Sequence, residues 1–129
     1  MAETANFVLP ARGIVVDATI VQGETWELNL LWSTTTDGTT ATPVNITGYT
    51  ARMMIRQGYE SSTPLISLTD TAGIALGGSA GTIKATLTST QTAGLTAGKC
   101  VYDLELVSPA GVVTNIARGT LTIIRNVTR

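Results

Sequence analysis

The stretch VYDLELVSPAGVV, residues 101–113, holds the pattern that decides the fold. Apolar and polar side chains alternate along its first half, a turn follows at residues 108–111, and apolar residues then resume. A period of two places successive side chains on opposite faces of a strand, and a glycine-containing turn between two such runs is typical of a β-hairpin. The stretch therefore predicts a hairpin with strands at about residues 100–107 and 112–124.

Short runs with the same alternation recur along the rest of the chain. They are rich in Val, Ile, Thr and Tyr and bounded by Gly, Asp, Ser and Pro, which favours strands over helices. The expected strands cover approximately residues 14–21, 25–32, 49–56, 65–68, 74–76 and 82–87. The polar stretch 33–48 is expected to be the longest irregular connection, with Pro43 interrupting any ladder. Gly119 interrupts the final strand and indicates a bulge or a change of pairing partner.

The spacing of these runs predicts the fold class. Seven to nine strands at spacings of about 8 to 14 residues favour an all-β fold, an antiparallel immunoglobulin-like β-sandwich. An eight-stranded jelly roll or a small barrel is the alternative. One short helical turn is expected near residues 89–94, because Thr88 or Ser89 can cap its start and Gly94 its end.

The composition indicates one domain whose surface carries few charges. Of 129 residues, 43% are hydrophobic and 13% are charged, so a single core can form and disorder is excluded. Residues 13–129 are expected to form one sandwich domain, while residues 1–12 form either an extended N-terminal arm on a neighbouring subunit or an ordinary first strand. Some of the apolar or Thr-rich surface is expected to be covered by another subunit.

Charge and hydropathy make two kinds of interaction unexpected, one with nucleic acid and one through a membrane-spanning helix. The net charge is −1, and no basic run interleaves with aromatic residues, so nucleic-acid binding is not expected. No apolar run approaches the roughly 20 residues that a membrane helix needs. Glu3 stands where a secretion signal would carry a basic segment, so the protein is expected to remain in the cytoplasm in which it is made or to leave by lysis.

The residue types needed for most catalytic and metal sites are missing. The chain has no histidine, which removes the Ser-His-Asp and Cys-His arrangements and imidazole ligands for zinc or copper. Cys100 is the single cysteine and is expected to be a small buried apolar residue. We therefore expect neither an enzyme nor a bound metal or cofactor.

Asp103 and Glu105 are the one pair of carboxylates that invites a functional interpretation. Two residues apart on a strand, they share a face, with Cα atoms about 6 to 7 Å apart, which suits a glycosidase pair or part of a calcium site. The opposite face of the strand is apolar and is expected to be buried. The carboxylates are therefore expected on the wetted or partner-covered side, in salt bridges with Arg52, Arg56 or Arg118.

Four stretches carry a resemblance to a known group of proteins. They are GETWELNLLW, PVNITGYTARMMIR, GTIKATLTSTQTAGLTAGKCVYDLELVSPAGVV and IARGTLTIIRNVTR, which together span Gly23 to Arg129. In this order they resemble small virion proteins of tailed bacteriophages and are similar to the immunoglobulin-like N-terminal domain of phage baseplate upper proteins. The chain lacks the long C-terminal part of that family, so the position in the virion stays open between tail tip, neck, head surface and fibre adaptor.

The resemblance implies a non-enzymatic structural protein without catalytic residues. It is expected in the virion, made in the host cytoplasm and not secreted, and to act by self-association and docking to other virion proteins. The alternative is a receptor- or glycan-binding module, for a host-surface glycan, that uses the loops at 33–48 and 58–64 with Trp32, Tyr49 or Tyr59 as stacking platforms. The residues expected to face a partner are Phe7, Leu9, Asp37, Tyr59, Asp103, Glu105 and Arg125.

Overall fold

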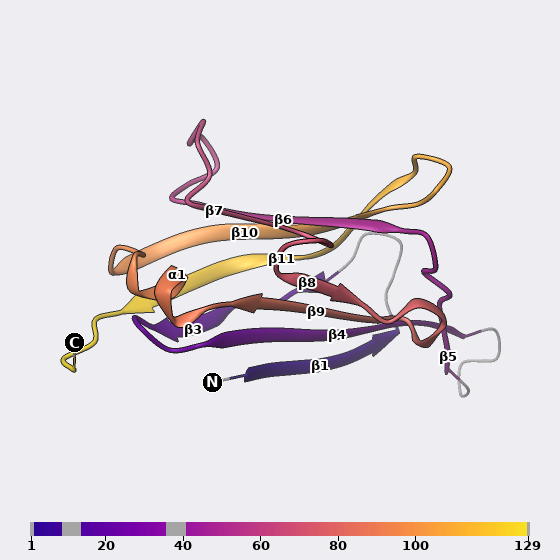
Figure 1. Ribbon diagram of the computed structural model, residues 1–129, viewed down its shortest axis with the longest axis horizontal. Helices are drawn as coiled ribbons and strands as arrows, with labels where there is room; N and C mark the ends of the chain where they lie inside the picture. The colour runs from indigo at the N-terminus through magenta and orange to yellow at the C-terminus, as the bar shows by residue number, and fades with distance from the viewer. Residues whose placement is uncertain (1, 9–13, 36–40, 129) are drawn as a thin grey trace.

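The computed structural model describes residues 2–8, 14–35 and 41–128 and consists of two β-sheets packed face to face (Figure 1). Sheet A contains β1 (Ala2–Val8), β4 (Trp26–Thr35), β5 (Ala41–Pro43), β8 (Ile74–Leu76) and β9 (Thr82–Leu87). Sheet B contains β2 (Ile14–Val15), β3 (Ala18–Val21), β6 (Thr50–Arg56), β7 (Ile66–Thr69), β10 (Gly98–Val107) and β11 (Val113–Ile124). The predicted all-β sandwich is confirmed.

The strand order shows two open sheets rather than a closed barrel. Sheet A runs β1-β4-β9-β8, with β5 also paired to β4, and sheet B runs β2-β11-β10-β6-β7, with β3 also paired to β11. Most pairs are antiparallel, as expected, but β1 pairs with β4 in parallel, and so do β2 and β3 with β11. With five strands in sheet A and six in sheet B, the described chain has more strands than the seven to nine expected. The additional strands are β1, β5 and one half of a strand that the structure divides in two.

The strand expected at 14–21 is divided beside Asp17, where its parallel ladder with β11 is interrupted. Val16 N donates to Arg118 O at 2.8 Å, and the Asp17 carboxylate then accepts from Thr120 N at 2.8 Å in place of a backbone carbonyl. A side chain on Gly119 would bring its Cβ within 2.2 Å of Val16 O, so only glycine fits there. At Gly119 the outer ladder of β11 is interrupted, because β2 pairs up to Arg118 and β3 pairs from Leu121, while β10 stays paired on the other side.

The bulge itself lies elsewhere in the same strand. In the β10–β11 ladder, Leu104 pairs with Ala117 and Glu105 with Asn115, which leaves Ile116 as the extra residue. Ile116 and Ala117 are both buried, so the bulge turns two successive side chains into the core.

The connection at 33–48 is less irregular than expected. β4 continues to Thr35, and β5 pairs with it up to Pro43 opposite Ser33. Pro43 is tolerated because it is the last residue of β5, and among the described strands β5 pairs with β4 alone. The N–H group that proline lacks is therefore not needed for pairing on the other side of β5.

The core is formed by the alternating residues that the sequence indicates. Cys100, Tyr102, Leu104 and Leu106 of β10 are all buried, and Trp26 of β4 packs against Tyr102 with ring centroids 6.5 Å apart. The burial of Cys100 confirms its expected role as an apolar core residue.

The short helical turn expected near residues 89–94 is α1 (Ser89–Ala93), which connects β9 to β10. It is capped at Thr88, one of the two expected caps, through a capping box with Gln91. A 3-10 turn, η1 (Gly78–Ala80), joins β8 to β9. Among the described residues, no helix is long and apolar enough to cross a membrane.

Candidate functional site

The outer face of sheet B carries the charged side chains that alternate out of β6, β10 and β11. Glu105 lies opposite Arg52 in the ladder, and Arg52 Nε donates to Glu105 Oε1 at 2.7 Å. The cross-strand salt bridge expected for this face is therefore present with Arg52. Both side chains are partly exposed, so the pair stabilises the sheet by only about 0–1 kcal/mol.

Asp103 lies in the middle of the same face, between Met54 of β6 and Arg118 of β11. Its Oδ2 accepts a long hydrogen bond of 3.4 Å from Asn115 Nδ2. Partial burial raises the pKa of Asp103 above the ordinary aspartate value, and the negative charge of Glu105 raises it further. Arg56, Asn115 and Arg52 act in the opposite direction without cancelling the rise.

Asp103, Glu105 and Arg118 take part in lining an open hollow of about 340 Å³, which we call the sheet B hollow. Its lining comes from three strands and one loop: Met54, Arg56, Tyr59, Val101, Tyr102, Asp103, Glu105 and Arg118. Tyr59 belongs to the connection between β6 and β7, which projects from the sheet B side of the molecule in Figure 1. Its side chain is 84% exposed, so an aromatic ring stands beside a polar hollow.

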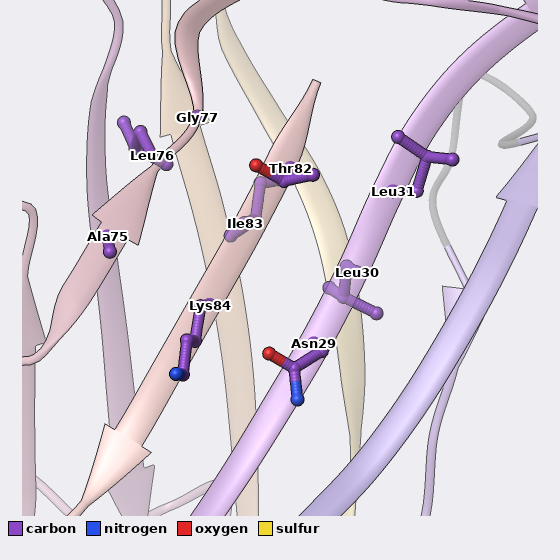
Figure 2. A pocket seen from close by; sticks show the side chains of 9 residues that line it. All are labelled: Asn29, Leu30, Leu31, Ala75, Leu76, Gly77, Thr82, Ile83 and Lys84. Carbon is purple, nitrogen blue, oxygen red and sulfur yellow. The ribbon is translucent and has the colours of Figure 1, made fainter. Parts of the chain in front are cut away.

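A second hollow, also of about 340 Å³, lies on sheet A. Figure 2 shows its lining, which comes from β4, β9, and β8 with the residue after it: Asn29, Leu30, Leu31, Ala75, Leu76, Gly77, Thr82, Ile83 and Lys84. Asn29 and Lys84 are neighbours across the β4–β9 ladder, and Lys84 Nζ forms a 2.8 Å salt bridge with Glu27 Oε2. The sheet A hollow thus combines small and apolar side chains with three polar or charged ones, Asn29, Thr82 and Lys84.

Sequence comparison gives no match, since neither a family model nor a curated protein matches this chain. Among solved structures, the N-terminal domain of phage TP901-1 ORF48 matches with a TM-score of 0.53 and 12% identity. The fold resembles that of this phage domain. The match covers 96% of this chain and 99% of the ORF48 domain, so the likeness extends over both sheets. At this identity it establishes the fold.

The sheet B hollow brings together three of the residues predicted to face a partner: Tyr59, Asp103 and Glu105. Arg125 is exposed beyond the end of β11 and does not line this hollow. Phe7 lies in β1, in register with Trp32. Leu9 and Asp37 lie outside the described residues.

Two of the three expected stacking platforms are occupied within the protein. Trp32 and Tyr49 pack against each other edge to face, with centroids 6.3 Å apart, and both are partly buried against the core. Tyr59 is thus the aromatic residue of the three that is exposed to a ligand.

The geometry gives the carboxylate pair no metal-binding or hydrolytic arrangement. Within residues 2–8, 14–35 and 41–128, no three Asp, Glu, Cys or His side chains converge on one point. Glu105 is bound by Arg52, whereas a calcium cage takes six or more oxygens and a glycosidase needs two carboxylates facing each other across a substrate. The carboxylates are placed to accept hydrogen bonds.

The lining of the sheet A hollow was not singled out by the sequence. Asn29, Ala75 and Lys84 are ordinary outward residues of three strands, and only the strand order places them around one depression. The sequence pattern shows which residues point outward, but the order of strands depends on pairing between distant segments.

Proposed function

We propose that the protein is a non-enzymatic structural component of a tailed bacteriophage virion. The observation that carries the proposal is the likeness of nearly the whole chain to the N-terminal domain of phage TP901-1 ORF48. The order of strand motifs that resembles phage virion proteins in the sequence supports the same conclusion independently of the backbone. The protein needs no metal or cofactor for this role.

Self-association and docking to other virion proteins are the proposed modes of action. Charged residues make up only 13% of the chain, and several large apolar side chains stand on the outside. These exposed apolar residues are Val15, Leu65, Val112, Val113 and Ile124. The sheet edges at β1, β7 and β8 also present backbone groups that can pair with another chain. Burial of such surface against a neighbour favours a closed, symmetric assembly.

The protein is proposed to be made in the host cytoplasm and built into the tail, baseplate, neck or head surface. The partner-facing residues proposed for this role include Arg125, which is exposed past the last strand, together with Phe7, Leu9 and Asp37. Residues 2–8 belong to sheet A as β1, and this N-terminal segment is proposed to take part in assembly as well, while residues 13–129 supply the other strands of the sandwich.

Quantitative mass spectrometry of purified particles of the encoding phage tests the proposal. We expect peptides of this chain at a fixed whole-number ratio to the major capsid protein, unchanged by a further density-gradient step. A non-structural phage protein of similar abundance in the infected cell serves as the control for carry-over. If the peptides of this chain leave the particle fraction in the same purification step as the control protein, the virion assignment is contradicted.

A further inference from the structure

The turn beside the sheet B hollow is closed by hydrogen bonds from Arg56 and Gly58 to Ser61. Arg56 Nη1 donates to Ser61 O at 2.9 Å, and Gly58 N donates to Ser61 Oγ at 3.2 Å. These two bonds close the turn on which Tyr59 stands, so the ring is presented at the rim. An aromatic side chain that is 84% exposed on a closed turn leaves apolar surface in water, which a flat apolar partner would cover.

The side chains that line the hollow carry charges of both signs. Arg52 and Glu105 neutralise each other in their 2.7 Å ion pair. Asp103 leaves a negatively charged acceptor beside the positively charged Arg56 and Arg118, so the lining presents hydrogen-bond acceptors and donors side by side. Such a lining fits a ligand whose groups both donate and accept hydrogen bonds, as hydroxyl groups do, since carboxylates only accept and guanidinium groups only donate.

Asp103 has hydrogen-bonding capacity left for such a ligand. The bond from Asn115 to its Oδ2 is 3.4 Å long, beyond the usual range of about 2.7–3.2 Å. Its Oδ1 accepts no hydrogen bond from the described part of the chain. A volume of about 340 Å³ lies at the small end of the range of roughly 300–1,000 Å³ for ligand sites. The hollow therefore fits a small polar ring rather than an extended molecule.

We propose that the sheet B hollow binds one sugar ring of an uncharged oligosaccharide. Tyr59 lies against the C–H face of the ring, and the Asp103 carboxylate accepts hydrogen bonds from adjacent hydroxyls. Arg56 borders the same hollow, and the N–H groups of its guanidinium beyond those bonded to Ser61 O and Met54 Sδ are donors for the ring and hydroxyl oxygens. This binding activity is additional to the structural role and does not depend on it, because it uses the outer face of one sheet within a single chain.

A glycan array of uncharged oligosaccharides containing glucose, galactose, rhamnose and N-acetylglucosamine units, followed by titration calorimetry with the best binder, tests the site. We expect saturable binding that Tyr59→Ala weakens at least about tenfold and Tyr59→Phe largely keeps, because the phenylalanine ring retains the apolar face. Asp103→Asn is expected to weaken binding because a carboxylate is the stronger acceptor. Glu60→Gln, next to Tyr59 but outside the hollow, is the matched control and leaves affinity unchanged.

Folding does not confound this test, because Tyr59 is exposed and its truncation removes no core contact. Equal thermal melting of wild type and Tyr59→Ala confirms that point. Absence of binding at millimolar saccharide, or binding that both Tyr59→Ala and Asp103→Asn leave intact, would overturn the proposal. A change in solution mass on Tyr59→Ala without any saccharide binding would also overturn it and assign this face to protein docking. Whether the chain is found in virions tests the proposed function and does not depend on the outcome of the saccharide-binding experiment.

Discussion

At the scale of single residues, Asp103 links the sheet B hollow to stability. Its pKa is raised by burial first and by Glu105 second, so the folded protein holds this proton to higher pH than the unfolded chain does. The stability that protonation contributes is present below the unfolded pKa of about 3.8 and is lost as the pH rises through the native pKa. At neutral pH the ionised Asp103 therefore makes the fold less stable than a neutral side chain would.

Asp103→Asn is accordingly expected to stabilise the protein at neutral pH. The gain should be only a few tenths of a kcal/mol, since Asp103 is only partly buried and solvent screens its charge. It should shrink to zero as the pH falls below about 3.8, where both states of the wild type are protonated. Thermal melts of wild type, Asp103→Asn and the control Glu60→Gln across this pH range measure the effect. A neutral-pH loss of stability in Asp103→Asn alone would show that the attraction of Arg56 and Arg52 for the ionised carboxylate outweighs burial and the repulsion by Glu105.

The same residues show what a local pattern can predict. That Asp103 and Glu105 share the outer face, and that Cys100 is buried, follows from a period of two and needs no knowledge of neighbouring strands. The exposure of Tyr59 does not follow from any period, because it depends on Arg56 reaching Ser61 to close a turn. The carboxylates of the candidate site were therefore predictable as a pair, whereas the hollow around them was not.

At the scale of elements, β1 is the strand whose role differs most from the others. Among the strands that the structure describes, it pairs with β4 alone, in parallel, with Ala2 opposite Glu27 and Val8 opposite Ser33. Such pairing between an N-terminal strand and a distant segment leaves no alternation or turn in the sequence to reveal it. The sequence does not reveal the division of residues 14–21 into β2 and β3 for a similar reason. The Asp17 carboxylate takes the place of a backbone carbonyl as acceptor only when folding brings Thr120 N beside it.

Deletion of residues 2–8 separates the two interpretations of this segment. Since β1 pairs with β4 along its whole length, we expect the truncated chain to melt at a lower temperature and to associate through the newly open edge of β4. Differential scanning calorimetry and light scattering report the two effects. A chain that melts unchanged and no longer assembles would instead identify the segment as an arm that acts on a neighbouring subunit.

At the scale of the whole molecule, sparse charge and exposed apolar side chains lead to a prediction about assembly. We expect light scattering across a concentration series to give one discrete closed oligomer. Because only 13% of residues are charged, the contacts should be mainly apolar and the mass should persist at about 1 M salt, where surface charges are screened within about 3 Å. A strict monomer at high concentration would contradict self-association of the isolated chain, and dissociation by salt would contradict apolar contacts.

The pairing of β3 with β11 also determines when the protein can fold during its synthesis. Asp17 and Thr120 are 103 residues apart, yet the bond between them joins β2 and β3 to the middle of the last strand. Translation at about 5–20 residues per second delivers these partners several seconds apart. Until Ile124 has left the ribosome, β3 has no ladder to complete and the edge of β10 that receives β11 stays open. Folding of sheet B is thus a late event in the life of the nascent chain, and a truncated translation product would expose unpaired strands.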